Sequence, residues 1–315
     1  MAETTPLELE NPWLVTAWPG MGAVAHVAGK YLVHKLGARR IADVPADDFF
    51  DIASVRVKGG VVELGDPPEN VFYGWKNPGD GPDLVLFLGE KQPAGGGYRF
   101  CGKVLEMSAK MNVSRVVTFA ALGTPIHPRA ESRVLAVASR GELLDELKQS
   151  QVTILEDGEI GGLNGVFLAA AAEQGHDGVC LLGEFPYFAR TVPNPKASSA
   201  VLRVFARLAG IELDLKELDE QAEVVERNLV QHIQQLERAA EALAASRQDE
   251  GFTIPERHEE QEHTLDPEVE ARIEALFEQA RQNRDTALEL KAELDRQGVF
   301  REYEDRFLDL FKQAE

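Results

Sequence analysis

Residues 159–184, EIGGLNGVFLAAAAEQGHDGVCLLGE, hold a complete turn, helix and strand and decide the fold class. A glycine-rich turn at 161–165 runs into an alanine-rich segment that predicts a helix. GVCLLGE then forms a nearly continuous apolar run, which is typical of a strand buried on both faces. A helix that leads into such a strand indicates a parallel sheet covered by helices. The turn itself could bind a ligand or only bring the helix close to the sheet.

The same alternation of strands and helices extends over residues 12 to about 212. Further strands are predicted at WLVTAW, RRIADV, NVFYGWK, DLVLFLG, VSRVVTFAALG and SRVLAVAS. Further helices are predicted at GMGAVAHVAGKYLVHKLG, FCGKVLEMSAKM, RGELLDELKQ and PKASSAVLRVFARLAG. IASVRVKGGVVEL reads as a hairpin about Gly59 and Gly60. This order predicts an α/β fold with a mostly parallel sheet.

Charge divides the chain into two parts. The 315 residues include 53 acidic and 33 basic side chains, for a net charge of −20. From Glu212 to the end there are 29 acidic and 13 basic residues, so most of the excess lies in the last third. We therefore expect an α/β core at 1–213 and an acidic helical region at 214–315. So acidic a surface repels phosphate backbones and anionic lipids, which argues against nucleic-acid and membrane partners.

The acidic region has the spacing of amphipathic helices. One apolar stripe runs from Leu229 to Leu243 at alternating intervals of four and three residues. After a polar linker at 246–263, Asp266 as N-cap and Pro267 at the first position open a second helix. Its stripe runs through Asn283 to Leu294. We expect an antiparallel helical hairpin followed by a short last helix at about 300–310.

The two cysteines, Cys101 and Cys180, lie in apolar segments and have no spacing typical of a metal site. We expect two buried free thiols, no metal and no cofactor. The acidic first residues, MAETTPLELE, do not resemble a secretory signal, and no apolar run is long enough to span a membrane. These observations predict a cytoplasmic protein.

Two glycine turns are the candidate ligand-binding loops. Gly20-Met21-Gly22 follows a strand, opens a helix and fits a loose form of the dinucleotide fingerprint, with Asp43 placed as a ribose-binding acid. Gly162 and Asn164 belong to the second turn, whose helix start could hold an anion. Both turns equally fit tight packing of a helix on the sheet, and we favour that interpretation.

Three further polar residues are candidates for the same site. Glu90 and Glu184 each follow an apolar strand, and His127 lies on a loop between two prolines, close to Arg129 and Arg133. Acids at the carboxyl ends of strands are placed where α/β folds usually bind ligands. They could instead cap neighbouring helices, and the loop of His127 could be an ordinary one. No nucleophile elbow or phosphate-binding P-loop is present.

Four segments in order resemble the proteasome assembly chaperone two family over residues 12–230. They are AWPGMGAVAHVAGKYLVHKLGA, LVLFLGEKQP…YRFCGKVLEMSAKMNVSRVVTFAALGTPIHPR, EIGGLNGVFLAAAAEQGHDGVCLLGEFPYF and PNPKASSAVLRVFARLAGIELDLKELDEQAEVVE. The most specific parts are the GLNG turn with its LLGE strand, and the P-x-P-K-A-S helix with its IELDL ending. The order of the segments carries the resemblance.

The resemblance implies a three-layer α/β sandwich related in shape to nucleoside phosphorylases. It also implies a homo-oligomer, which is a trimer among bacterial members. Eukaryotic and archaeal relatives act in proteasome assembly. Archaeal members that engage the proteasome use a hydrophobic–tyrosine–any tail. This sequence ends in LFKQAE, so docking through that end is not expected.

The sequence thus predicts a non-enzymatic, oligomeric binding or assembly protein with a protein partner. The alternative is an enzyme of nucleoside-phosphorylase or carboxylate-amine ligase type, acting on a small anionic substrate through the glycine turns, Glu90, Glu184 and His127.

Overall fold

The computed structural model describes most of the chain as two compact units, Met1–Ala239 and Ala240–Glu315. The described residues are 7–45, 48–51, 55–150, 152–249, 267–282, 286–297, 299, 303 and 306–307. Of the predicted linker at 246–263, residues 246–249 are helical, and residues 250–263 lie outside the described residues. Asp266, Asn283, Phe300 and residues 308–315 also lie outside them. Each unit is treated by itself.

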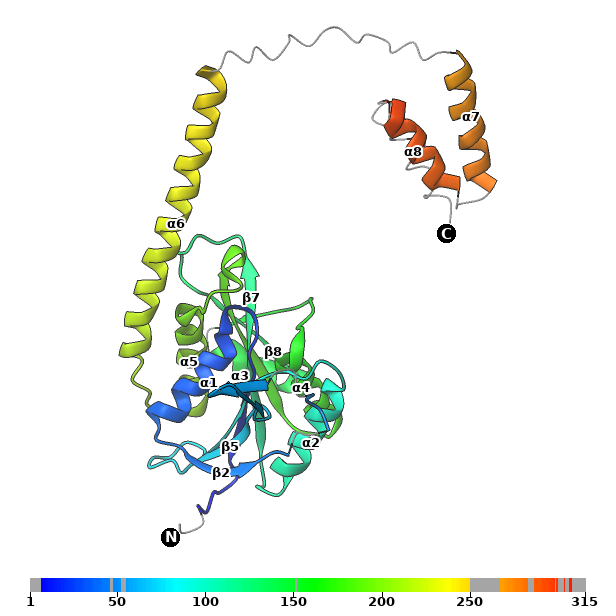
Figure 1. Ribbon diagram of the computed structural model, residues 1–315. Helices are drawn as coiled ribbons and strands as arrows, with labels where there is room; N and C mark the ends of the chain where they lie inside the picture. Colours follow the sequence, from blue (N-terminus) through cyan, green and yellow to red (C-terminus); the bar gives the residue numbers. More distant parts are fainter. Residues whose placement is uncertain are drawn as a thin grey trace. The chain divides into compact units, whose positions relative to one another are not determined.

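A sheet of eight strands forms the centre of the first unit (Figure 1). Its order is β2-β5-β6-β1-β7-β10-β8-β9. The bounds are β1 (Trp13–Ala17), β2 (Arg39–Asp43), β5 (Asn70–Trp75), β6 (Leu84–Gly89), β7 (Arg115–Thr124), β8 (Val134–Ala138), β9 (Thr153–Ile154) and β10 (Gly178–Pro186). The central strands β6, β1, β7 and β10 are parallel, whereas β5 and β8 join them antiparallel. The predicted α/β fold with a mostly parallel sheet is confirmed.

Helices cover both faces of this sheet. They are α1 (Val24–Lys35), α2 (Gly97–Ala109), α3 (Leu144–Gln149), α4 (Gly162–Glu173) and α5 (Pro195–Ala209), with short 3₁₀ turns η1 (Met21–Ala23), η2 (Gly141–Leu143) and η3 (Tyr187–Ala189). Helix α6 (Lys216–Asp249) follows α5 in the chain. On one face α1 contacts α5, and on the other α2 contacts α4. The result is a three-layer sandwich with one apolar core on each side of the sheet.

The central strands read as apolar runs because they are buried on both faces. Every residue of β10 is buried, including Leu181 on one face and Cys180 on the other. Helix α1 comes unusually close to the sheet at Gly29, where a methyl group would lie 2.7 Å from the Cβ of Ala17. Small residues at this contact explain the composition of α1 without any ligand.

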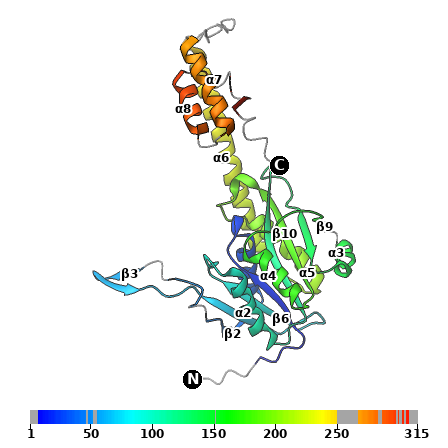
Figure 2. The ribbon, with the colours of Figure 1, turned by 90° about the vertical axis from the view of Figure 1, so that its right-hand side faces the viewer.

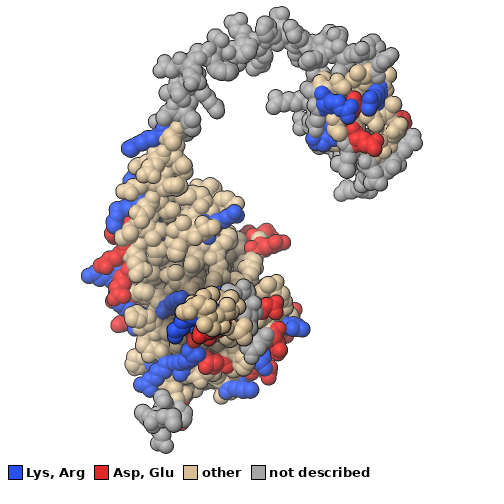
Figure 3. All heavy atoms as spheres, in the orientation of Figure 1, with Lys and Arg blue, Asp and Glu red and all other residues tan. Residues whose placement is uncertain are grey.

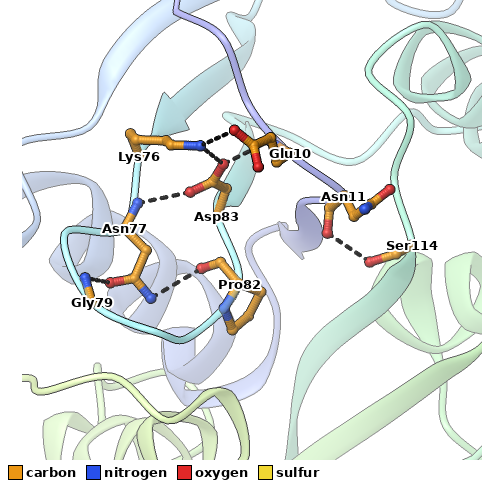
Figure 4. Close-up of polar contacts among 8 residues, drawn as sticks. All are labelled: Glu10, Asn11, Lys76, Asn77, Gly79, Pro82, Asp83 and Ser114. Atoms are coloured by element: carbon orange, nitrogen blue, oxygen red, sulfur yellow. Dashed lines mark hydrogen bonds and ion pairs between the residues drawn. The ribbon is translucent and has the colours of Figure 1, made fainter.

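The amino-terminal edge of the sheet is closed by a polar cluster around Asp83 (Figure 4). The buried Asp83 carboxylate accepts hydrogen bonds from the backbone N–H groups of Glu10 and Asn77, and Lys76 Nζ lies 2.9 Å from it. Burial alone would raise the pKa of Asp83, but these donors and the Lys76 charge hold it below its ordinary value. The cluster ties the segment before β1 to the loop before β6.

The predicted hairpin about Gly59 and Gly60 is a separate two-stranded sheet. It comprises β3 (Val55–Lys58) and β4 (Val61–Leu64), and both turn glycines have positive φ. The two-residue strand β9 was not predicted, because so short a strand leaves little periodicity to detect. The strands end before residue 213, where the sequence places the end of the core. Residues Lys216–Ala239 of α6 belong to the first compact unit.

The second unit contains α7 (Pro267–Gln282) and α8 (Ala287–Gln297), which contact each other. The sequence predicted one helix across this stretch, and that prediction is wrong. Two helices packed together bury Ile273, Phe277, Leu290 and Leu294 against one another. A single straight helix would have left the same stripe without a partner inside this unit.

Candidate functional site

The two glycine turns meet at the carboxyl-terminal edge of the central strands. The first turn follows β1 and leads into α1, and the second opens α4, whose far end leads into β10. A cavity of about 370 Å³ lies between them. Its lining residues are Gly20, Met21, Ala25, Gln92, Ala120, Ala121, Leu122, Glu159, Ile160, Gly161, Gly162, Asn164 and Leu182. The structure therefore brings together four predicted site residues, Gly20, Met21, Gly162 and Asn164.

Asn164 is buried and forms two hydrogen bonds with the backbone of Trp18. Its Oδ1 accepts a hydrogen bond from the Trp18 N–H at 3.0 Å, and its Nδ2 donates to the Trp18 carbonyl at 3.2 Å. This pair of bonds holds the start of α4 to the end of β1, 146 residues away in sequence. The side-chain amide therefore has a structural role, because it pairs with the N–H and the carbonyl of Trp18 in the middle of the site.

Gln92 links the two turns to each other. Its Nε2 donates to the carbonyl of Pro19 in the first turn, and its Oε1 accepts the N–H of Leu163 at 2.9 Å in the second. The Leu163 N–H is one of the unpaired donors at a helix start that would otherwise attract an anion. Gln92 already fills that position with a neutral acceptor.

The second turn needs glycine for its backbone. Gly162 has φ of +74°, in the left-handed region that side chains rarely adopt. A methyl group on Gly165 would lie 2.3 Å from the carbonyl oxygen of Ile160. The geometry of the turn itself accounts for both glycines, through the positive φ of Gly162 and the close approach of the Ile160 carbonyl to Gly165.

The first turn is closed by backbone contacts. The N–H of Gly22 donates to the carbonyl of Arg190 at 2.8 Å, and the carbonyl of Gly22 accepts the N–H of Asn194 at 2.7 Å. Asn194 in turn caps α5 by accepting the N–H of Ala197. Met21 stays half exposed at the mouth of the cavity.

Glu184 forms a bidentate ion pair on β10. Its carboxylate, 1% exposed, accepts Arg133 Nε at 2.6 Å and Nη2 at 2.7 Å, and it also accepts the Thr124 hydroxyl at 2.9 Å. The bonds from Arg133 lower the pKa of Glu184 below its ordinary value despite its burial. All of these donors come from the ends of β7 and β8 and the loop between them, so the carboxylate fixes that loop to β10.

Glu90 and His127 lie away from the cavity lining. Glu90 is exposed, and its Oε2 accepts the N–H of Glu69 at 2.8 Å, which fixes the loop before β5. His127 is exposed on the loop after β7, and its Nδ1 accepts the N–H of Arg129 at 3.1 Å. The structure does not bring these two residues together with the glycine turns.

The dinucleotide interpretation of the first turn is wrong in its placement of Asp43. In that fold the second strand lies beside the first. Here β2 is the edge strand, with β5 and β6 between it and β1, and the Asp43 carboxylate pairs with Arg40 at 2.5 Å. No acid from β2 reaches the first turn.

Neither cysteine has the character of a reactive thiol. Cys101 and Cys180 are buried and free, and burial raises the pKa of each to about 12, far from thiolate reactivity at neutral pH. Within the described ranges, no three His, Cys, Asp or Glu side chains are grouped so as to hold a metal ion. None of the described helices is suited by length and hydropathy to crossing a bilayer.

A family model described as the PAC2 family matches residues 14–233. Among solved structures, PbaB of Pyrococcus furiosus, an archaeal proteasome activator, is 28% identical with a TM-score of 0.62, and the match covers 72% of this chain and 95% of PbaB. Rv2125 of Mycobacterium tuberculosis, a proteasome-assembly chaperone homologue, is 25% identical with a TM-score of 0.60, covering 69% and 94%. MJ1210 of Methanocaldococcus jannaschii, an uncharacterized protein, is 27% identical over 248 residues, covering 76% of this chain and 92% of that protein.

Proposed function

The chain belongs to the PAC2 family, and from this premise we propose that it is a non-enzymatic, homo-oligomeric protein that binds a protein partner in the manner of an assembly chaperone. The match confirms the resemblance read from the four sequence segments. A trimer and a cytoplasmic location are part of the proposal.

The observation that carries the proposal is the state of the polar groups at the carboxyl edge of the sheet. Asn164 is bonded to Trp18, Gln92 joins the two turns, and Glu184 is paired with Arg133. Among the described residues that line the cavity, Glu159 is the sole charged side chain. A small anionic substrate is bound most strongly by cationic side chains, and the described lining supplies a carboxylate and no cation.

The surface also suits a protein partner better than a polyanion. Figure 3 shows Lys and Arg intermixed with Asp and Glu around the visible face of the first unit, with uncharged residues between them. Such a face lacks the basic stripe that phosphate backbones require. PbaB is described as a proteasome activator and Rv2125 as a proteasome-assembly chaperone homologue, so proteasome core subunits are the first partners to test.

The first experiment is co-migration of the purified full chain with proteasome core subunits in size-exclusion chromatography with light scattering. We expect a complex whose mass fits an oligomer of this chain bound to those subunits. A chain that migrates independently of them at every concentration would contradict the proteasome part of the proposal.

The second experiment tests the enzymatic alternative with the same protein. Phosphate, nucleosides, ATP and NAD are added in a thermal unfolding assay. A ligand present at 100 times its dissociation constant stabilises the folded state by about 2.7 kcal/mol. We expect no saturable shift, and a shift accompanied by turnover would establish the enzyme interpretation instead.

A further inference from the structure

The hairpin β3–β4 has two chemically different faces. Residues directly opposite each other in an antiparallel pair lie on the same face. One face holds two apolar pairs, Val55 with Leu64 and Val57 with Val62, and is called the apolar face. The other face holds Arg56 with Glu63 and Lys58 with Val61.

The apolar face is uncovered within one copy of the chain. All residues of β3 and β4 are exposed, and Figure 2 shows the hairpin extending away from the main sheet. A two-stranded hairpin on its own is marginally stable in water. Contiguous exposed apolar side chains of this kind mark an interaction surface.

A second exposed apolar cluster lies at the carboxyl end of β10. Tyr187, Phe188 and Val192, called the η3 patch, expose 57%, 50% and 39% of their surfaces. The patch is anchored beside the first glycine turn, since the Gly22 N–H donates to the carbonyl of Arg190. In the described part of the first unit, exposed large apolar residues cluster along the sequence in the hairpin and in this patch.

Building on the oligomeric function proposed above, we propose that the apolar face of the hairpin of one copy packs on the η3 patch of a second copy. Neither of these two places adds to the repulsion between the acidic surfaces. Two chains of net charge −20 repel each other. Residues 55–64 carry Arg56 and Lys58 against Glu63, and Arg190 is the one charged residue in 185–193. The contact therefore avoids the acidic surface of both copies.

The size of the hairpin also favours a second copy over an unrelated partner. A standard interface buries about 800 Å² on each partner, more than four aliphatic side chains provide. In a closed ring each copy donates one hairpin and receives one, and the neighbouring cores can add further contact area. A head-to-tail contact of this kind fits a cyclic trimer.

A matched pair of valines tests the apolar face. Val57 and Val61 are each 65% exposed and lie on opposite faces of the same hairpin. We expect Val57→Asp to weaken self-association at least about tenfold, because it places a charge in an apolar contact, and Val61→Asp to leave it unchanged. Light scattering over a concentration series measures both. Loss of assembly in both variants, or in neither, would overturn the proposal.

Mixing variants tests which surface receives the hairpin. Phe188→Asp should also dissociate the oligomer. An equal mixture of Val57→Asp and Phe188→Asp chains should form dimers, because one intact hairpin still faces one intact patch. Absence of recombination would overturn the pairing of hairpin and patch.

A cross-link makes the result independent of any folding defect. In the full chain carrying Val57→Cys and Phe188→Cys, oxidation should give intermolecular disulfides, whereas Val61→Cys with Phe188→Cys should give few. A chain carrying Val57→Cys and Phe188→Cys that is oligomeric but does not cross-link refutes this contact and leaves the oligomeric function standing. A monomeric wild-type chain refutes both.

Discussion

The two glycine turns are alike in sequence and differ in how the structure uses them. In the second turn Gly162 and Gly165 are required by the backbone, and Gln92 and Asn164 close the start of α4 with side chains. In the first turn Gly22 is held by the backbone of Arg190 and Asn194, and Ala23, which is not a glycine, has φ of +48°. A glycine-rich turn at a helix start is therefore weak support for a ligand, since packing alone accounts for one turn and backbone contacts hold the other.

The largest expected effect separates close packing from ligand binding in the second turn. Gly165→Ala places a methyl group 2.3 Å from the Ile160 carbonyl oxygen. Because that contact is with backbone, we expect a loss of about 3 kcal/mol in the free energy of unfolding. Urea unfolding measures it.

Gly161→Ala is the matched control for this change. Gly161 has ordinary φ, and a methyl group there meets no atom within 4 Å. We expect a change below about 1 kcal/mol, the cost of alanine at an N-cap. Equal losses in the two variants would mean that the close contact between Gly165 and the Ile160 carbonyl is not the cause of the loss.

The next effect concerns whether the Glu184 carboxylate at the end of β10 is available for chemistry. Arg133→Ala leaves the buried Glu184 carboxylate with Thr124 but without its cation, and we expect a loss of about 1–3 kcal/mol at pH 7. Arg129→Ala, an exposed arginine in the same loop, should change little.

The pH dependence identifies the ion pair as the cause. The pKa of Glu184 is lowered in the folded chain, mainly by Arg133, so its contribution is present above the unfolded value of about 4.3 and is lost as pH falls through the folded pKa. The difference between wild type and Arg133→Ala should therefore be largest near neutral pH and vanish in acid. A difference independent of pH would assign the loss to packing.

A smaller effect tests the link between the turns. Gln92→Ala removes one donor and one acceptor, and we expect a loss of about 1–2 kcal/mol. Gln92→Glu keeps an acceptor for the Leu163 N–H and should lose less, because a carboxylate is favourable at a helix start. Thermal unfolding with and without phosphate completes the test. Stabilisation of Gln92→Ala by phosphate would show that the second turn is an anion site closed by its own side chain.

Local periodicity was enough to predict the α/β fold, because most of its strands and helices show their pattern within about ten residues. It missed the two-residue strand β9 and the break between α7 and α8. The site was harder to predict because its decisive contacts join distant residues. Gln92 lies 71 residues from Leu163, and Arg133 lies 51 from Glu184. The sequence around Gln92, GEKQP, does not indicate Leu163 as its partner, and the sequence around Arg133, RAESR, does not indicate Glu184. The hairpin shows the same limit, because alternating valines predict a strand but do not say what covers its apolar face.

The smallest expected effect concerns the first turn. Here the substitution should raise the free energy of unfolding, whereas the substitutions above lower it. A side chain in the left-handed region costs about 1–2 kcal/mol, and Ala23 is held there at φ +48° and ψ +21°. Ala23→Gly removes that cost but gives the unfolded chain more freedom, worth about 0.4–1 kcal/mol. We expect a net gain of a few tenths of a kcal/mol or more in the free energy of unfolding. Ala206→Gly, at a similarly half-buried position inside α5, should instead lose about 1 kcal/mol. If both variants lose stability equally, the left-handed conformation of Ala23 carries no strain in solution, and this difference between the two turns disappears.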